Sequence, residues 1–125
     1  MQLVPMRARA VRWSSGIPTD PDPSHIKLKA QGEHLAQTLG PHHAALMRAH
    51  GFVLAGLSAS DLVRLAVYIP RNARALMHAM QMGEYKALSR GEIEARLALD
   101  IHSPALKRGW EFWAREVGCE NLLAD

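Results

Sequence analysis

Apolar residues recur at helical spacing most clearly between residues 59 and 82. Ser58 and Asp61 form an S-x-x-D start, which is typical of a helix N-terminus. The apolar positions that follow are three or four residues apart and share one helix face: Leu62, Leu65, Ala66, Ile69, Ala73, Leu76, Met77 and Met80. Gly83 is a favourable residue just beyond a helix C-terminus. The pattern therefore predicts one long amphipathic helix over 59–82.

Pro70 lies inside this helical pattern. A proline in a helix interior removes the hydrogen bond to the carbonyl four residues earlier, here that of Ala66, and crowds that turn. We therefore expect a kink near residues 66–69, or two helices placed end to end.

Shorter helical patterns occupy three more ranges. Residues 30–39 end at the stop signal Gly40-Pro41. Ser89 and Glu92 form a capping box that opens a helix over 90–100. Ser103 and Pro104 provide a cap and a first-turn proline for a helix over 104–117. Its expected apolar face consists of Leu106, Trp110, Trp113 and Val117.

Two short apolar runs at about 44–55 are bracketed by glycine and proline, which favours a pair of buried strands over one helix. The segment 1–29 has no sustained period, and its three prolines between residues 18 and 23 predict an extended loop. Residues 4–13 could form an edge strand before that loop. Together these elements predict an α+β fold, with residues 30–125 as the packed part of a single domain.

Composition narrows the class of protein. A chain of 125 residues with 48% hydrophobic content suits one domain, and its few aromatic residues predict a core of Leu, Ala, Val, Ile and Met. The net charge of +3 is spread along the chain, which argues against a nucleic-acid partner. No apolar run approaches the ~20 residues that cross a bilayer, so we expect no membrane partner. Cys119, the single cysteine, cannot form an internal disulfide. This indicates a reducing compartment, the cytoplasm.

The chain contains seven histidines, and His50 differs from the others in its setting. It lies between two expected strands and next to Gly51, where a tight turn can present a side chain to a site. His25, His34, His78 and His102 are interpreted as solvated or hydrogen-bonded residues. Spacing alone leaves His50 open between a metal ligand and a hydrogen-bonded, partly buried residue, because no H-x-H, H-E-x-x-H or C-x-x-C motif accompanies it. No serine elbow or glycine-rich phosphate loop is present either.

A small cation-binding protein that uses His42, His43 and His50 is a further alternative. Adjacent histidines point in different directions in a strand and in a helix, which argues against a chelate. Trp110 and Trp113 could form a stacking platform, but their helical spacing favours a core or subunit interface.

Four segments carry a more specific pattern: QGEHLAQTLG at 31–40, ALMRAHGFVLAG at 45–56, AVY at 66–68 and NAR at 72–74. They resemble the second half of the class II aldolase/adducin family. In that family a histidine followed by glycine, between two strands, supplies the last metal ligand. The resemblance therefore implies that His50 is a metal ligand, in a fragment of an α/β/α sandwich. The segments PDPSHIK at 21–27 and RGWEFWAREVG at 108–118 resemble decarboxylases of aromatic or ring-cleaved hydroxy acids.

The resemblance implies a metal-dependent carbon–carbon lyase that acts on a hydroxy acid or a sugar phosphate, by decarboxylation or retro-aldol cleavage. The implied cofactor is a divalent metal, zinc first, with manganese, cobalt or magnesium as alternatives. The family also implies a homotetramer with sites between subunits.

The chain departs from the family in two respects. The H-x-H ligand pair and the catalytic acid precede the matching half in the family, and residues 1–29 contain no counterpart. Pro70 stands where the family helix has another residue. We therefore expect a truncated lyase that binds metal weakly and is inactive alone. The alternative is a non-catalytic, adducin-like remnant or interaction module.

Overall fold

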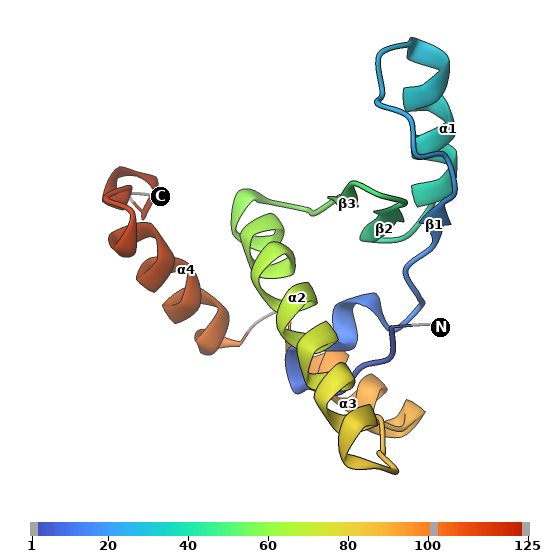
Figure 1. Ribbon diagram of the computed structural model, residues 1–125. Coiled ribbons are helices and arrows are strands. Elements are labelled where there is room, and N and C mark those ends of the chain that lie inside the picture. The colour runs from blue at the N-terminus through green and yellow to red at the C-terminus, as the bar shows by residue number, and fades with distance from the viewer. Residues whose placement is uncertain (1–2, 101–102, 124–125) are drawn as a thin grey trace.

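The computed structural model describes residues 3–100 and 103–123 and has an α+β architecture (Figure 1). Its elements, in chain order, are η1 (Ala8–Trp13), β1 (Thr19–Asp20), α1 (Lys29–Leu39), β2 (Ala44–Met47), β3 (Gly51–Leu54), α2 (Ala59–Met82), α3 (Arg90–Asp100), α4 (Pro104–Glu116) and η2 (Glu120–Leu123). The four α-helices of this described part match the predicted ranges within one residue at each end. The α+β class is therefore confirmed.

A small mixed sheet joins β1, β2 and β3 in that order. β2 and β3 pair antiparallel, with Ala44 opposite Leu54 and Met47 opposite Gly51. This hairpin confirms the strand pair predicted at about 44–55, but β3 is not buried as predicted, because Gly51 and Phe52 are exposed and Val53 and Leu54 are half-buried. β1 is a two-residue edge strand that runs parallel to β2, and it lies in the proline-containing segment that was predicted to be a loop.

The edge strand expected at residues 4–13 is wrong, because Ala8–Trp13 form the 3₁₀ helix η1. A 3₁₀ helix repeats every three residues, so Ala10 and Trp13 lie on the same face. Both are 1% exposed and pack with Leu65 and Ile69 of α2. Burial of this face, which local sequence does not reveal, selects the helix over the strand.

The buried core of the described residues consists mainly of Ala, Leu, Val and Ile, as predicted, and Trp13 is among its largest fully buried side chains. Its indole N–H finds no acceptor within the described ranges, so packing alone favours burial of the ring. The first segment of the chain is thus part of the hydrophobic core.

α2 buries Leu65, Ile69, Asn72 and Leu76, which are spaced three or four residues apart. Ser58 caps the helix by accepting a hydrogen bond from the backbone N–H of Asp61, at 3.2 Å, as the S-x-x-D pattern predicts. Other predicted face residues, including Met77 and Met80, are exposed.

α2 is continuous through Pro70, so the expectation of two helices end to end is wrong. The carbonyl that Pro70 leaves without its helical partner belongs to Ala66. Ala66 is exposed, so water can serve that carbonyl and the helix need not break.

Asn72 ties the N-terminal segment to α2 through its side-chain amide. Its Oδ1 accepts a hydrogen bond from the N–H of Met6 at 2.9 Å, and its Nδ2 donates to the carbonyl of Val4 at 2.8 Å. Asn72 is only 1% exposed. Its amide therefore satisfies two backbone groups of a segment that has no strand partner there.

α4 differs from its predicted face. Ala114 is the buried residue of this helix, and Leu106, Trp110 and Trp113 are half-buried. Val117, which was expected in the core, is 73% exposed and lies just past the helix end. Ser103 makes no side-chain capping hydrogen bond, although Pro104 does occupy the first turn as predicted.

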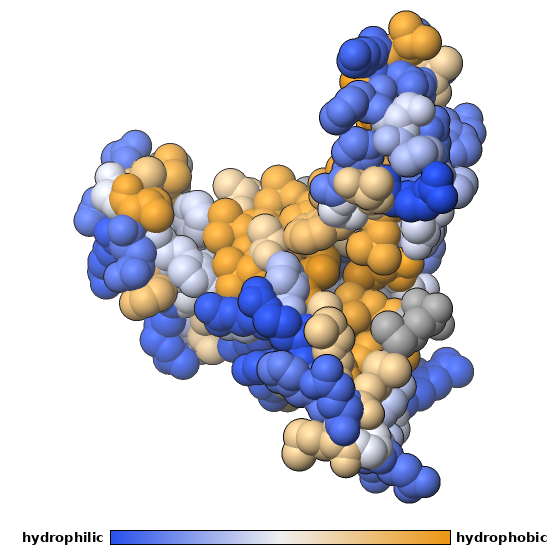
Figure 2. Space-filling model, viewed as in Figure 1, coloured by the Kyte–Doolittle hydropathy of each residue, from blue (hydrophilic) through white to orange (hydrophobic). Residues whose placement is uncertain are grey.

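α1 and α4 project from opposite sides of α2 and the sheet (Figure 1). Apolar residues gather on the hollow face between these two helices, whereas the outer parts of α1 and α4 are polar (Figure 2). We call this hollow the apolar saddle. No helix in the described part of the chain has the length and hydropathy to span a membrane.

Asn72→Ala is expected to lower the free energy of unfolding by about 2 kcal/mol, because it leaves the Met6 N–H and the Val4 carbonyl without their partner in a partly buried position. Arg74→Ala, at an exposed position of the same helix, should change it by less than about 0.5 kcal/mol. Urea unfolding monitored by tryptophan fluorescence measures both. Equal stability of the two variants would contradict this role of Asn72.

Candidate functional site

His50 lies at the end of the tight turn that connects β2 to β3. Its backbone N–H donates to the carbonyl of Met47 at 3.0 Å, which closes a four-residue turn. Ala49, the third residue of that turn, has a φ of +66°, in the left-handed region that non-glycine residues rarely adopt. Gly51 follows with a φ of +126°. This strained turn places the His50 side chain at the protein surface.

The imidazole of His50 is held by the proline-containing loop before α1. Nε2 of His50 lies 2.8 Å from the carbonyl oxygen of Pro23. A carbonyl can only accept, so Nε2 carries the proton, and in the neutral ring the lone pair is on Nδ1. Metal-bound histidines commonly use one nitrogen as ligand while the other donates to a carbonyl or carboxylate. His50 therefore has the tautomer and orientation of such a ligand.

His25 lies against His50, with ring centroids 4.9 Å apart and ring planes 50° apart. Two imidazoles on one tetrahedral ion, with nitrogen–metal distances of about 2.1 Å, have centroids roughly 5 Å apart. The separation of His25 and His50 thus suits a shared divalent cation. We call these two residues the histidine pair. From the sequence, His25 was interpreted as a solvated or hydrogen-bonded residue, because 24 residues separate it from His50 and a local pattern does not reveal their proximity.

The histidine pair does not complete a metal site by itself. Within residues 3–100 and 103–123, no group of three or more His, Cys, Asp or Glu side chains could hold a metal ion. A catalytic zinc ordinarily has three protein ligands. The described residues therefore fit the implied metal in part, with two imidazoles and no third ligand.

Two aspartates, Asp20 and Asp22, lie in the segment that carries His25, but their carboxylates accept hydrogen bonds from that segment. Asp20 is buried, accepts a hydrogen bond from the N–H of Asp22 at 3.0 Å, and is 3.6 Å from Nε2 of His34. Asp22 accepts from the N–H of Ser24 at 2.8 Å. Hydrogen bonds from Ser24 hold the pKa of Asp22 below its ordinary value, with smaller contributions from His34 and Arg48. Both carboxylates thus organise the loop that carries His25.

The cation site proposed from His42, His43 and His50 is not assembled. His42 and His43 precede β2, whereas His50 follows it, at the other end of a strand about 13 Å long. Nδ1 of His43 donates to the carbonyl of Ala55 at 3.2 Å, and Nδ1 of His42 is 3.3 Å from Oγ of Ser15. Each of these two histidines therefore has a local structural partner.

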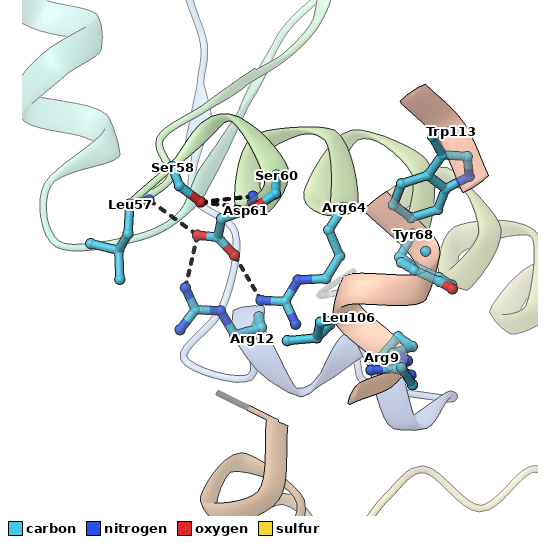
Figure 3. Close-up of a pocket in the computed structure, with 12 residues that line it drawn as sticks. Arg9, Arg12, Leu57, Ser58, Ser60, Asp61, Arg64, Tyr68, Leu106 and Trp113 are labelled. Carbon is cyan, nitrogen blue, oxygen red and sulfur yellow. Dashed lines mark hydrogen bonds and ion pairs between the residues drawn. The ribbon is translucent and has the colours of Figure 1, made fainter. Parts of the chain in front are cut away.

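A cavity of about 290 Å³ opens at the start of α2, away from the histidine pair (Figure 3). η1, the first turns of α2 and the first turns of α4 line it. The lining residues are Arg9, Arg12, Leu57, Ser58, Ser60, Asp61, Arg64, Tyr68, Ala105, Leu106, Gly109 and Trp113. We call it the arginine cavity. Arg9 and Arg12 are close together in the sequence, but Asp61 and Arg64 join them only through the fold.

Asp61 organises the polar side of the arginine cavity. Its Oδ1 is 2.7 Å from Nη2 of Arg64, and its Oδ2 is 2.9 Å from Nη2 of Arg12 (Figure 3). The N–H of Leu57 also donates to Oδ2, at 3.1 Å. Burial by itself raises the pKa of Asp61, but the hydrogen bonds from Arg64, Leu57 and Arg12 outweigh it, so the pKa lies below its ordinary value of 3.8. Asp61 is therefore ionised at neutral pH.

Ala49→Gly is expected to leave the free energy of unfolding unchanged or to raise it by up to about 1 kcal/mol, because glycine adopts a positive φ without a Cβ penalty. Ala49→Val should lower it by about 1–2 kcal/mol, since a β-branched residue is strongly disfavoured there. Urea unfolding ranks the three proteins. A valine variant as stable as the parent would show that the turn is not strained.

Asp61→Asn is expected to destabilise the protein by about 3 kcal/mol at pH 7, because two largely buried guanidinium groups lose their shared carboxylate. The folded state lowers the pKa of Asp61, so its stabilisation is present above the unfolded pKa of about 3.9 and is lost as pH falls through the folded value. The difference between the two proteins should therefore shrink below about pH 4. Asp22→Asn, at an exposed carboxyl, is the control and should show a much smaller difference, by urea unfolding across pH 3–7.

The segments that carry the family resemblance form α1, the β2–β3 hairpin and α2, and these elements place His50 at the exposed turn. No model of a known protein family matches the chain, and no curated protein matches its sequence. The features of the described residues that bear on function are the histidine pair, the arginine cavity and the exposed apolar surface.

Proposed function

We propose that this chain is part of a metal-dependent carbon–carbon lyase of the class II aldolase/adducin type, with His50 as a ligand of a divalent cation. The observation that carries the proposal is the position of His50 on a strained turn, with Nε2 bonded to a backbone carbonyl and Nδ1 left for a ligand. Strained backbone at an exposed turn is a common feature of binding and catalytic sites. The segment resemblance at 31–82 assigns the same residue.

The proposed cofactor is zinc, with manganese, cobalt or magnesium as alternatives, and His25 is the proposed second imidazole. A bound divalent cation supplies Lewis-acid stabilisation of the negative charge that develops on substrate oxygens when a carbon–carbon bond breaks. The described residues bring two of the three protein ligands that such an ion needs. We therefore infer weak metal binding by this chain alone, with the remaining ligands and the catalytic acid supplied from outside the described residues.

The proposed substrate is a small hydroxy acid, or in the second instance a sugar phosphate. Both present adjacent oxygens that chelate a cation. The proposed assembly is a homotetramer. Exposed apolar surface supports an association role, because Leu57 and Met82 are 87% and 88% exposed.

The second candidate is a non-catalytic interaction module. It is favoured by the absence of a three-ligand group within the described ranges, together with the apolar saddle (Figure 2). The two candidates differ in the histidine pair. In the proposed lyase both imidazoles are metal ligands, whereas in an interaction module they are only a pair of surface rings in contact.

Zinc titration of the metal-free chain by calorimetry at pH 7.5 tests the proposal. We expect one zinc per chain with micromolar or weaker affinity, and at least a tenfold loss in both His25→Ala and His50→Ala. His78→Ala, an exposed histidine on α2, is the matched control and should leave the affinity unchanged.

Equal zinc affinity in His50→Ala and His78→Ala would contradict the lyase proposal and favour the interaction module. A second experiment measures the decarboxylation of hydroxy acids with added zinc. It compares this chain with a longer chain that includes the preceding coding sequence. We expect activity only in the longer chain, and only when His50 is intact. Equal activity of the two chains would overturn the inference that ligands come from outside the described residues.

A further inference from the structure

A basic cluster lies where the segment before η1 meets the middle of α2, and it shares no residue with the histidine pair or the arginine cavity. It lines an open hollow of about 650 Å³, whose described lining consists of Arg7, Arg71, Arg74, Ala75 and His78. We call it the basic hollow. We propose that the basic hollow binds a compact anion with two or more linked phosphate groups. The proposal is independent of metal binding at His50.

Two segments of the chain bring these cationic side chains together. Arg71, Arg74 and His78 are spaced i, i+3 and i+7, so they lie along one face of α2 over about 10 Å. Arg7 precedes η1 in extended backbone, with φ −135° and ψ 148°. Asn72 accepts a hydrogen bond, at 2.9 Å, from the backbone N–H of the residue just before Arg7, which holds Arg7 beside this part of α2.

No acidic side chain of the described residues neutralises the basic hollow. Within residues 3–100 and 103–123, no ion pair or hydrogen bond engages the side chains of its three arginines or of His78. The chain has no Asp or Glu at positions 1–19 or 62–83, the stretches that form the hollow. Elsewhere several cationic side chains have a carboxylate within 4.0 Å: Lys29 with Glu33, Arg90 with Glu94, and Lys107 with Glu111.

The spacing of these cations makes them repel one another. Arg71 and Arg74 are three residues apart, and Arg74 and His78 are four apart, so each pair lies side by side on the helix surface. Such a pair destabilises a helix when both groups are charged. An anion that contacts several of them removes the repulsion and accepts charge-assisted hydrogen bonds from the planar guanidinium forks. The basic hollow therefore favours a multivalent ligand.

An aromatic ring already restricts one of the arginines. Cζ of Arg71 lies over the ring of Tyr68, 5.6 Å from its centroid. This cation–π contact limits the motion of the side chain, so less conformational entropy is lost when an anion binds. Ala75, the one uncharged residue type in the described lining, adds only a methyl group between the cations.

Charge and lining together select the ligand class. One phosphate group carries about 1.5–2 negative charges at pH 7, so two linked phosphates balance the three arginines, whereas a single phosphate leaves at least one uncompensated. The described lining contains no Trp, Tyr or Phe, so it offers no stacking surface for a nucleic-acid base. These features favour a compact diphosphate or polyphosphate over a single phosphate and over nucleic acid.

Calorimetric titration of the metal-free full chain, at pH 7.5 and low ionic strength, tests the proposal. The probes are inorganic pyrophosphate, inorganic phosphate and a short single-stranded oligothymidylate. We expect one pyrophosphate to bind per chain, at least tenfold more tightly than inorganic phosphate and more tightly than the oligothymidylate. Because the chain is metal-free, a bound cation cannot account for pyrophosphate binding.

Charge-matched double variants locate the site. Arg71→Gln combined with Arg74→Gln should weaken pyrophosphate binding at least tenfold, because two of the three guanidinium groups are lost. Arg90→Gln combined with Arg96→Gln, at exposed positions on α3, removes the same net charge and should change the affinity by less than about twofold.

Urea unfolding gives a second measurement on the same proteins. Saturating pyrophosphate should raise the unfolding midpoint of the parent and of the α3 double variant, because a ligand that binds only the folded state stabilises it. It should not raise the midpoint of the α2 double variant. The midpoints without pyrophosphate verify that each variant is folded.

Three results would overturn the proposal. They are no saturable binding of pyrophosphate, equal pyrophosphate affinities of the two double variants, and inorganic phosphate or oligothymidylate that binds as tightly as pyrophosphate. His50→Ala should bind pyrophosphate as the parent does, and a loss there would place the anion at the histidine pair instead. The zinc titration uses different residues and a different probe, so the two proposals fail separately.

Discussion

Asp61 lies where the N-terminal segment, the start of α2 and the arginine cavity meet. Its carboxylate accepts from Arg12 of η1 and from Arg64 of α2, and both guanidinium groups are largely buried. A buried carboxylate without these partners would be strongly disfavoured, and so would two buried arginines without the carboxylate. The ion pairs therefore fix the position of η1 on α2. They also arrange two guanidinium groups along one wall of the cavity.

Asn72 also holds the N-terminal segment against α2, farther along the helix and through a neutral side chain. Its amide forms hydrogen bonds with the backbone of Val4 and Met6. Trp13 packs in the core between the ion pairs of Asp61 and the hydrogen bonds of Asn72. Together they convert a segment with no periodic pattern into part of the core. The exposed apolar saddle shows that the same chain leaves other apolar surface uncovered (Figure 2).

The histidine pair and the arginine cavity arise from different parts of the structure. His25 and His50 meet because the loop before α1 packs against the β2–β3 turn, where the Pro23 carbonyl orients His50. The cavity forms where η1, α2 and α4 converge. The first place brings two imidazole rings together, and the second brings arginine side chains together with Asp61.

The sequence by itself determined the four described α-helices, the β2–β3 hairpin and the candidate His50, because helical spacing, capping residues and Gly51 are local signals. Only the tertiary structure decided that residues 8–13 form a helix and that α2 continues through Pro70. It also decided that His25 meets His50 and that Arg12 and Arg64 share Asp61. Those outcomes depend on burial and on contacts between residues distant in the chain, and a local pattern contains no record of either.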